Sequence, residues 1–115
     1  MKTIVAGSRG FCNEQYLFDA LEELPWQITE VVSGRAKGAD QLGEKWAHKH
    51  HIPCRFFPAD WSLYGAKAGP IRNHQMAQYA EAVVVFWDGQ SKGTQHMISI
   101  ARRHKLPLKI ILYRT

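Results

Sequence analysis

The sequence has little cysteine and no long hydrophobic segment. Its two cysteines, Cys12 and Cys54, form no CxxC pair, so neither a disulfide framework nor a thiol-rich metal site is expected. No window approaches the roughly 18 apolar residues of a membrane-spanning helix. The first apolar stretch ends at Gly7, which is too early for the core of a signal peptide. We therefore expect a reduced, cytoplasmic protein that does not enter a membrane.

Repeats, linkers and low-complexity segments are also absent from the sequence. The chain has 115 residues, of which 45% are hydrophobic and 22% are charged. This is the composition of an ordinary globular domain, and a chain of this length has room for one hydrophobic core. We predict a single domain over residues 1–115.

Charge is distributed unevenly along the chain. The net charge is +5, yet residues 10–34 hold five acids and no base, whereas residues 89–115 hold six bases and no acid. A basic segment attracts phosphate-bearing partners, but bases at a helix end also offset the helix dipole. No zinc-finger spacing or RNA-recognition signature is present. Nucleic-acid binding, as in a DNA-processing accessory protein, is kept as an alternative that only this charge supports.

Hydrophobic periodicity predicts alternating strands and helices. The predicted strands are 3–6, 30–32, 55–57, 82–87 and 108–112, and the predicted helices are 13–24, 40–50, one opening at 69–70, and 94–104. Residues 60–68 are predicted to be an irregular loop. This order predicts an α/β fold, a single Rossmann-like domain of about five mostly parallel strands with helices on both faces. Such sheets bind ligands at the carboxyl ends of their strands.

Three glycine-containing loops follow predicted strands. They are Gly7-Ser8-Arg9-Gly10, the segment from Ser33 to Asp40, and the segment from Asp88 to Thr94. In a parallel sheet these loops share one rim, where glycines let backbone N–H groups approach an anion and the following helices direct their positive ends. Each loop alone is also typical of a tight turn, and neither GxGxxG nor GxxxxGK[ST] occurs. Together they predict a phosphate site.

The segments VAGSRGF, VVSGRAKGAD, FPADWSLYGAKAGPIRNHQMA and VVVFWDGQSKGTQHMI occur in this order. They resemble the small YspA/YpsA-related members of the SLOG superfamily, which also contains the Smf/DprA DNA-processing proteins and the LOG phosphoribohydrolases. The resemblance covers roughly residues 3–101 and implies a nucleotide or nucleotide-derived ligand, NAD- or ADP-ribose-type compounds included. By position it implies ligand-binding roles for Gly7, Ser8, Arg9, Ser33, Gly34, Gly38, Ala39, Asp40, Arg72, Asn73, Ser91, Gly93 and Thr94.

The sequence departs from the LOG pattern at one important place. LOG enzymes carry a PGGxGTxxE-type loop whose glutamate helps to cleave an N-glycosidic bond, but here Gly93-Thr94 is followed by Gln95, His96 and Met97. Such cleavage needs nearby negative charge or an acid-base pair. The chain is therefore interpreted as a nucleotide-ligand-binding protein, with a nucleotide-processing hydrolase as the alternative. The candidate catalytic residues for that alternative are His96, Asp88 and Asp60.

Other side chains suggest more specific roles. Arg72 is expected to clamp phosphate with its planar guanidinium, Asp40 to cap its helix or hold a ribose hydroxyl, and Trp61 to stack on a base. The run from His48 to His51 is interpreted as a solvated helix end, and no metal site or certain cofactor is predicted. Apolar helix faces permit a homodimer.

Overall fold

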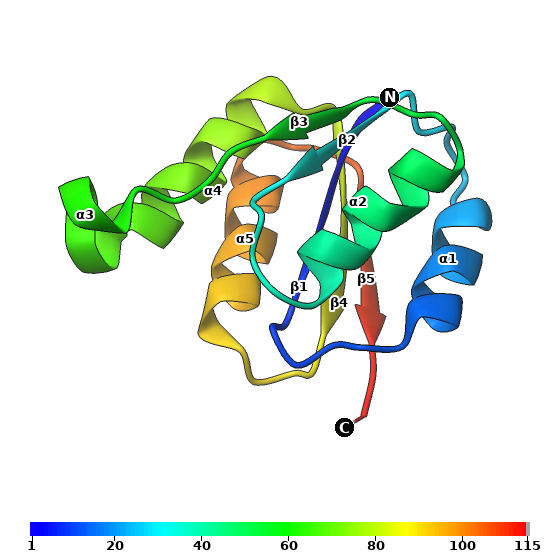
Figure 1. Cartoon of the computed structure of the whole chain (residues 1–115). Coiled ribbons are helices and arrows are strands. Elements are labelled where there is room, and N and C mark those ends of the chain that lie inside the picture. The colour runs from blue at the N-terminus through cyan, green and yellow to red at the C-terminus, as the bar shows by residue number, and fades with distance from the viewer. Residues whose placement is uncertain (115) are drawn as a thin grey trace.

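The computed structural model describes residues 1–114, which form one five-stranded sheet covered by helices (Figure 1). The strands are β1 (Lys2–Gly7), β2 (Glu30–Ser33), β3 (Cys54–Phe56), β4 (Ala82–Trp87) and β5 (Leu108–Leu112). The helices are α1 (Glu14–Glu22), α2 (Ala39–Lys49), α3 (Trp61–Tyr64), α4 (Ala68–Tyr79) and α5 (Lys92–Arg103), with the 3₁₀ turn η1 (Gly65–Lys67) between α3 and α4. None of these helices is long and apolar enough to cross a membrane.

All the strand pairs are parallel, and the strand order is β3-β2-β1-β4-β5. The chain winds outward from β1 in one direction as far as β3 and then crosses to β4 on the other side of β1. The strand order therefore reverses between β1 and β4, and in such sheets this switch point is where the crevice for a ligand opens. The predicted α/β, Rossmann-like fold is confirmed.

The central strand β4 shows why both faces of the sheet are covered. Its side chains alternate, so that Val83 and Val85 join the core beneath α4 and α5, whereas Val84 and Phe86 join the core beneath α1 and α2. All four are fully buried. A strand that is apolar at every position needs helices on both faces, and Figure 1 shows this pairing of helices.

The prediction that residues 60–68 form an irregular loop is wrong. Trp61–Tyr64 form α3, and η1 follows directly. The reason is a local cap: the Asp60 carboxylate accepts hydrogen bonds from the Leu63 backbone N–H at 3.1 Å and from the Ser62 hydroxyl at 2.8 Å. No residue of α3 is buried, and the helix projects from the body of the protein (Figure 1).

Candidate functional site

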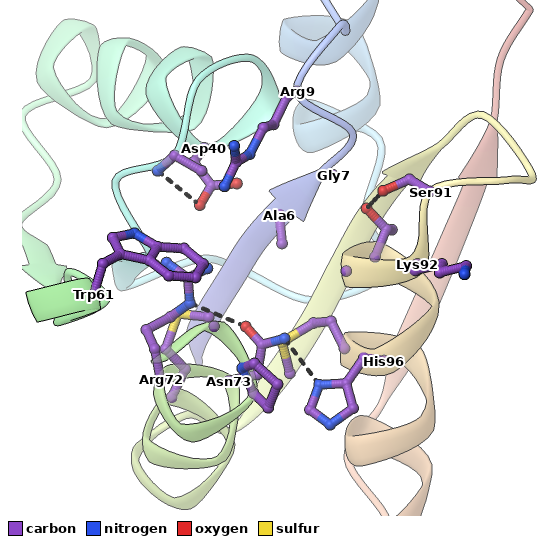
Figure 2. A pocket seen from close by; sticks show the side chains of 17 residues that line it. Ala6, Gly7, Arg9, Asp40, Trp61, Arg72, Asn73, Ser91, Lys92 and His96 are labelled. Atoms are coloured by element: carbon purple, nitrogen blue, oxygen red, sulfur yellow. Dashed lines mark hydrogen bonds between the residues drawn. The ribbon is translucent and has the colours of Figure 1, made fainter. Parts of the chain in front are cut away.

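A cavity of about 370 Å³ opens at the switch point, between the N-terminal turns of α4 and α5 and above the end of β1. Its volume lies within the ~300–1,000 Å³ range of small-molecule sites. The residues that line it come from every loop of the predicted rim: Ala6, Gly7, Arg9, Ala36, Asp40, Trp61, Gly69, Pro70, Arg72, Asn73, Met76, Ser91, Lys92, Gly93, Thr94, His96 and Met97. Figure 2 shows Arg9, Trp61 and Arg72 on one side of this cavity and Ser91 on the other.

A chain of hydrogen bonds runs along the cavity wall from α4 to α5. Arg72 Nε donates to Asn73 Oδ1 at 3.0 Å, and Asn73 Nδ2 lies 3.1 Å from His96 Nδ1. Because the amide oxygen already accepts from Arg72, the amide nitrogen is assigned as the donor to His96. The buried amide of Asn73 is thereby satisfied at both ends, which fixes the positions of the two side chains beside it.

His96 is held in its neutral form by its surroundings. Burial lowers the pKa of His96, and the charges of His74 and Arg103 lower it further. With Nδ1 accepting from Asn73, the proton of the neutral ring lies on Nε2. His96 therefore offers a hydrogen-bond donor on the side away from Asn73.

Asp40 is the carboxylate among the residues that line the cavity. Only 4% of its surface is exposed, and burial raises its pKa to about 6, against the lowering effect of the nearby Arg72 charge and of the backbone N–H of Ala36. That N–H donates to Asp40 Oδ2 at 3.3 Å. The expectation that Asp40 caps its helix is wrong. Gly38 occupies the N-cap of α2, and Asp40 lies inside the first turn.

Arg72 reaches the sheet because position 34 has no side chain. Its Nη1 donates to the Gly34 carbonyl oxygen at 2.6 Å. A Cβ atom at Gly34 would lie 2.3 Å from Nη1 and 2.8 Å from Cζ of Arg72, closer than real Cβ atoms approach other heavy atoms. Gly34 and Arg72 are thus fitted to one another, and the guanidinium is half-buried in the place that this glycine leaves.

Arg9 adds a second positive charge close to Arg72. Burial lowers the pKa of Arg72, and the charge of Arg9 lowers it further. Among residues 1–114, no hydrogen bond or ion pair of the Arg9 side chain is found, and this side chain is exposed. Two guanidinium groups with one buried carboxylate between them leave a net positive charge at the cavity, and a bound anion would relieve it.

The loop between β4 and α5 is held in place by Asp88. Its Oδ1 accepts from the backbone N–H groups of Gln90 at 2.9 Å and Ser91 at 2.8 Å, and these bonds lower its pKa. The α5 N-terminus has no side-chain cap, since the Ser91 hydroxyl lies 3.3 Å from that of Thr94 instead. The first backbone N–H groups of α5 are therefore available to a ligand.

The structure brings together ten of the predicted site residues on the cavity wall. These are Gly7, Arg9, Asp40, Trp61, Arg72, Asn73, Ser91, Gly93, Thr94 and His96. Gly34 lines a smaller hollow beside the cavity. Of the other residues predicted to bind the ligand, Ser8, Ser33, Gly38 and Ala39 line neither of these two spaces.

Two of those four residues hold the rim together. The Ser8 hydroxyl accepts from the Asp88 backbone N–H at 3.3 Å. The Ser33 hydroxyl donates to Glu44 Oε2 at 2.6 Å and accepts from the Arg35 N–H. The hydroxyl groups of Ser8 and Ser33 bond to other residues of the protein, so the two serines support the rim and do not line the cavity.

The three candidate catalytic residues do not meet. His96 lines the cavity, whereas Asp60 caps α3 and Asp88 holds the β4–α5 loop, and neither aspartate is on the cavity wall. Lys92 is on the wall, yet its side chain points away in Figure 2. Sequence reasoning missed Ala36, Gly69 and Met97, which carry no polar signal. Residues 1–114 contain no group of three or more His, Cys, Asp or Glu side chains placed to hold a metal ion.

The architecture and the cavity place the chain among the parallel α/β proteins that have a crevice at the switch point of the sheet. Comparison with known proteins identifies the family. The YAcAr family model (YspA, cpYpsA-related SLOG family) matches residues 1–64, and the chain belongs to this family. It is 32% identical to the Gene 61 protein of Mycobacterium phage D29 over 117 residues, and this alignment covers 93% of each chain. No solved structure matches. Membership of the SLOG family points to a nucleotide-related function.

Proposed function

We propose that this protein binds a phosphorylated nucleotide or nucleotide-derived ligand in the cavity between α4 and α5. The observation that carries the proposal is the convergence of Arg9 and Arg72 with the uncapped N-terminus of α5 around one cavity. Guanidinium groups and helix N-termini are recurrent protein partners of phosphate. The family membership, which points to nucleotides, supports the same ligand class.

In this proposal each part of the cavity recognises a different part of the ligand. A phosphate group occupies the α5 N-terminus beside Ser91 and Thr94. The Asp40 carboxylate accepts a hydrogen bond from a ribose hydroxyl, as acidic residues do in other dinucleotide-binding sheets. Trp61, which is 50% exposed and borders the cavity, supplies a flat apolar surface for a base.

The test is titration calorimetry of the full chain with the 5′-monophosphates of the four common nucleosides, after mass spectrometry of any nucleotide retained through purification. Arg9→Ala is the informative variant, because its exposed side chain supports no other residue. We expect its affinity to fall roughly 10- to 100-fold, the loss of a charged hydrogen bond of about 1.5–3 kcal/mol. Lys37→Ala, which removes an exposed charge that lines neither space, is the matched control. Absence of both a retained nucleotide and any measurable binding would reject the proposal.

A second candidate function is hydrolysis of the bound nucleotide, which one observation favours. Asp40 lines the cavity with a pKa of about 6, and a group that exchanges its proton near neutral pH suits general acid-base catalysis. Product analysis after incubation with each nucleotide distinguishes the two functions. Turnover that Asp40→Asn abolishes while binding persists would establish the hydrolase, whereas unchanged nucleotides after long incubation leave binding alone.

A further inference from the structure

A smaller hollow of about 140 Å³ lies beside the main cavity. The two spaces share Arg9, Ala36, Trp61 and Arg72 as a common wall, and the smaller one continues past them to Gly34 and Arg35 at the end of β2. Its volume is below the ~300–1,000 Å³ of complete ligand sites. It therefore has room for one group of a ligand whose remainder occupies the main cavity.

The smaller hollow is lined by three arginines, Arg9, Arg35 and Arg72. The negative charges near them are few. Asp40 lies near Arg72, and Glu44 lies 3.6 Å from Arg35 Nη2 while also accepting the Ser33 hydroxyl. Three guanidinium groups thus lie near two carboxylates, each of which already has partners within the protein, so the net charge around the hollow is positive. Arginines gathered around a small space are typical of phosphate recognition.

Arg35 is held in a defined orientation although its side chain is half exposed. The guanidinium carbon lies 4.3 Å from the centre of the Phe56 ring, a cation–π contact. Its backbone has a φ of 61°, a left-handed conformation that is costly for a residue with a side chain. The charge is therefore placed at the hollow by both its backbone and an aromatic support, which is unlike a freely moving surface arginine.

We propose that the ligand carries two separate phosphate groups, one bound at the N-terminus of α5 and the other bound by Arg35 in the smaller hollow, while Arg9 and Arg72, which line both spaces, contact both phosphates. This inference rests on the proposed function, and it names the class of nucleotide that the site takes. A nucleoside with phosphates at two positions and a 5′-phosphorylated dinucleotide both have this chemistry. In either ligand, Trp61 borders the part that joins the two phosphates.

The experiment compares three ligand series on the full chain by titration calorimetry at one fixed ionic strength. They are the nucleoside 5′-monophosphates, the nucleoside 3′,5′-bisphosphates and the 5′-phosphorylated dinucleotides. We expect one of the two doubly phosphorylated series to bind at least about tenfold more tightly than the monophosphates, the difference made by one additional charged contact. The series that has this advantage identifies which of the two ligand types the site takes.

Arg35→Ala isolates the second phosphate, because Arg35 lines the smaller hollow and not the main cavity. We expect this variant to lose the advantage of the doubly phosphorylated ligand, about tenfold, and to keep its affinity for monophosphates. Arg35→Lys should regain part of the advantage. The control Lys37→Ala removes a neighbouring charge and should change neither affinity. A thermal unfolding curve checks that the loss of the Glu44 and Phe56 contacts leaves the fold intact.

The outcomes separate this inference from the proposed function. Equal affinity for singly and doubly phosphorylated ligands would contradict the inference of a second phosphate site, and so would an affinity advantage that Arg35→Ala does not remove. Neither result would contradict the proposed nucleotide site. Failure of all three series to bind would overturn both.

Discussion

Two aspartates lie at the same rim, Asp40 in the first turn of α2 and Asp88 in the β4–α5 loop, and their surroundings shift their pKa values in opposite directions. Asp40, in the segment after β2, is buried among a few polar partners, and burial raises its pKa to about 6. Asp88, in the segment after β4, accepts two backbone hydrogen bonds that lower its pKa. The same type of side chain is thus a destabilising group beside the cavity at position 40 and a structural support at position 88.

The two aspartates therefore have different roles at this rim. The β4–α5 loop uses its aspartate to satisfy its own backbone, so that the helix behind it presents free N–H groups. The first turn of α2 holds the Asp40 carboxylate where hydration is poor, and its ionised form is favoured by the nearby Arg72 charge and by the backbone of Ala36 and Gly34. A side chain that lowers the stability of the fold in its ionised form is a candidate for function.

Among the substitutions that test this difference between Asp40 and Asp88, Arg72→Ala should change the free energy of unfolding most. The substitution removes donors to the Gly34 carbonyl and the Asn73 amide, and it leaves Asp40 without its positive neighbour. We expect a loss of about 3–5 kcal/mol in the free energy of unfolding near neutral pH, from buried groups left without partners. Urea denaturation measures it. The loss should shrink at low pH, where Asp40 is protonated. A loss that is the same at all pH values would contradict the coupling.

Asp40→Asn should have the next largest effect, with the opposite sign. Because the folded pKa of Asp40 is raised, the folded protein holds a proton between about pH 4 and pH 6 that the unfolded chain has released, so stability falls as pH rises through this window. Above it, the ionised carboxylate costs about 2–3 kcal/mol. We expect Asp40→Asn to stabilise the protein by this amount at about pH 8 and by little at about pH 4. Equal effects at both pH values would show that burial does not govern Asp40.

Gly34→Ala should have a smaller effect that tests how the β2–α2 loop depends on Arg72. The new methyl group would overlap the Arg72 guanidinium and would lie 3.0 Å from Asp40 Oδ2, so the arginine must move and Asp40 loses hydration. We expect a loss of about 1–3 kcal/mol in stability, typical of overpacking, and a higher pKa for Asp40. The measurement is the carboxyl ¹³C shift of Asp40 during a pH titration by NMR. An unchanged titration would mean that Arg72 remains in place.

Asp88→Asn should have the smallest effect, and it should have the opposite sign to that of Asp40→Asn. The lowered pKa of Asp88 means that its ionised form contributes stability above the usual aspartate range, and that this contribution disappears as pH falls through the folded pKa. We expect a slight destabilisation near neutral pH that vanishes in acid, measured as the difference in urea midpoint. Stabilisation instead would remove the contrast between the two loops.

The fold and the general position of the site could be predicted from the sequence. Alternating strands and helices imply a parallel sheet, and a parallel sheet gathers the loops that follow its strands at one edge. Arg9 and Thr94 could therefore be assigned to one site from the sequence, and the family resemblance added Arg72. The side chain of Asn13 caps α1 by accepting from the Tyr16 N–H, as asparagine commonly does at this position.

What the sequence could not predict were the partners of individual side chains across the fold. Ser33 lies in a glycine loop, as Ser91 does, but it bonds to Glu44 one turn into the next helix, so it faces away from the cavity. The Asn73–His96 contact joins two helices that are separated by β4. A shift of two residues in the N-cap of α2, from Asp40 to Gly38, decided whether Asp40 caps the helix or lines the cavity. These outcomes depend on helix rotation and packing, which periodicity does not specify.

The contact between Gly34 and Arg72 also constrains how this site can change in evolution. A side chain at position 34 would displace the guanidinium, and a shorter residue at position 72 would leave the Gly34 carbonyl without its donor. Neither single substitution is neutral, so the two positions must change together or remain as they are. Relatives in which a larger residue replaces Gly34 are therefore expected to have lost the arginine at position 72, and with it one of the positive charges at their cavity.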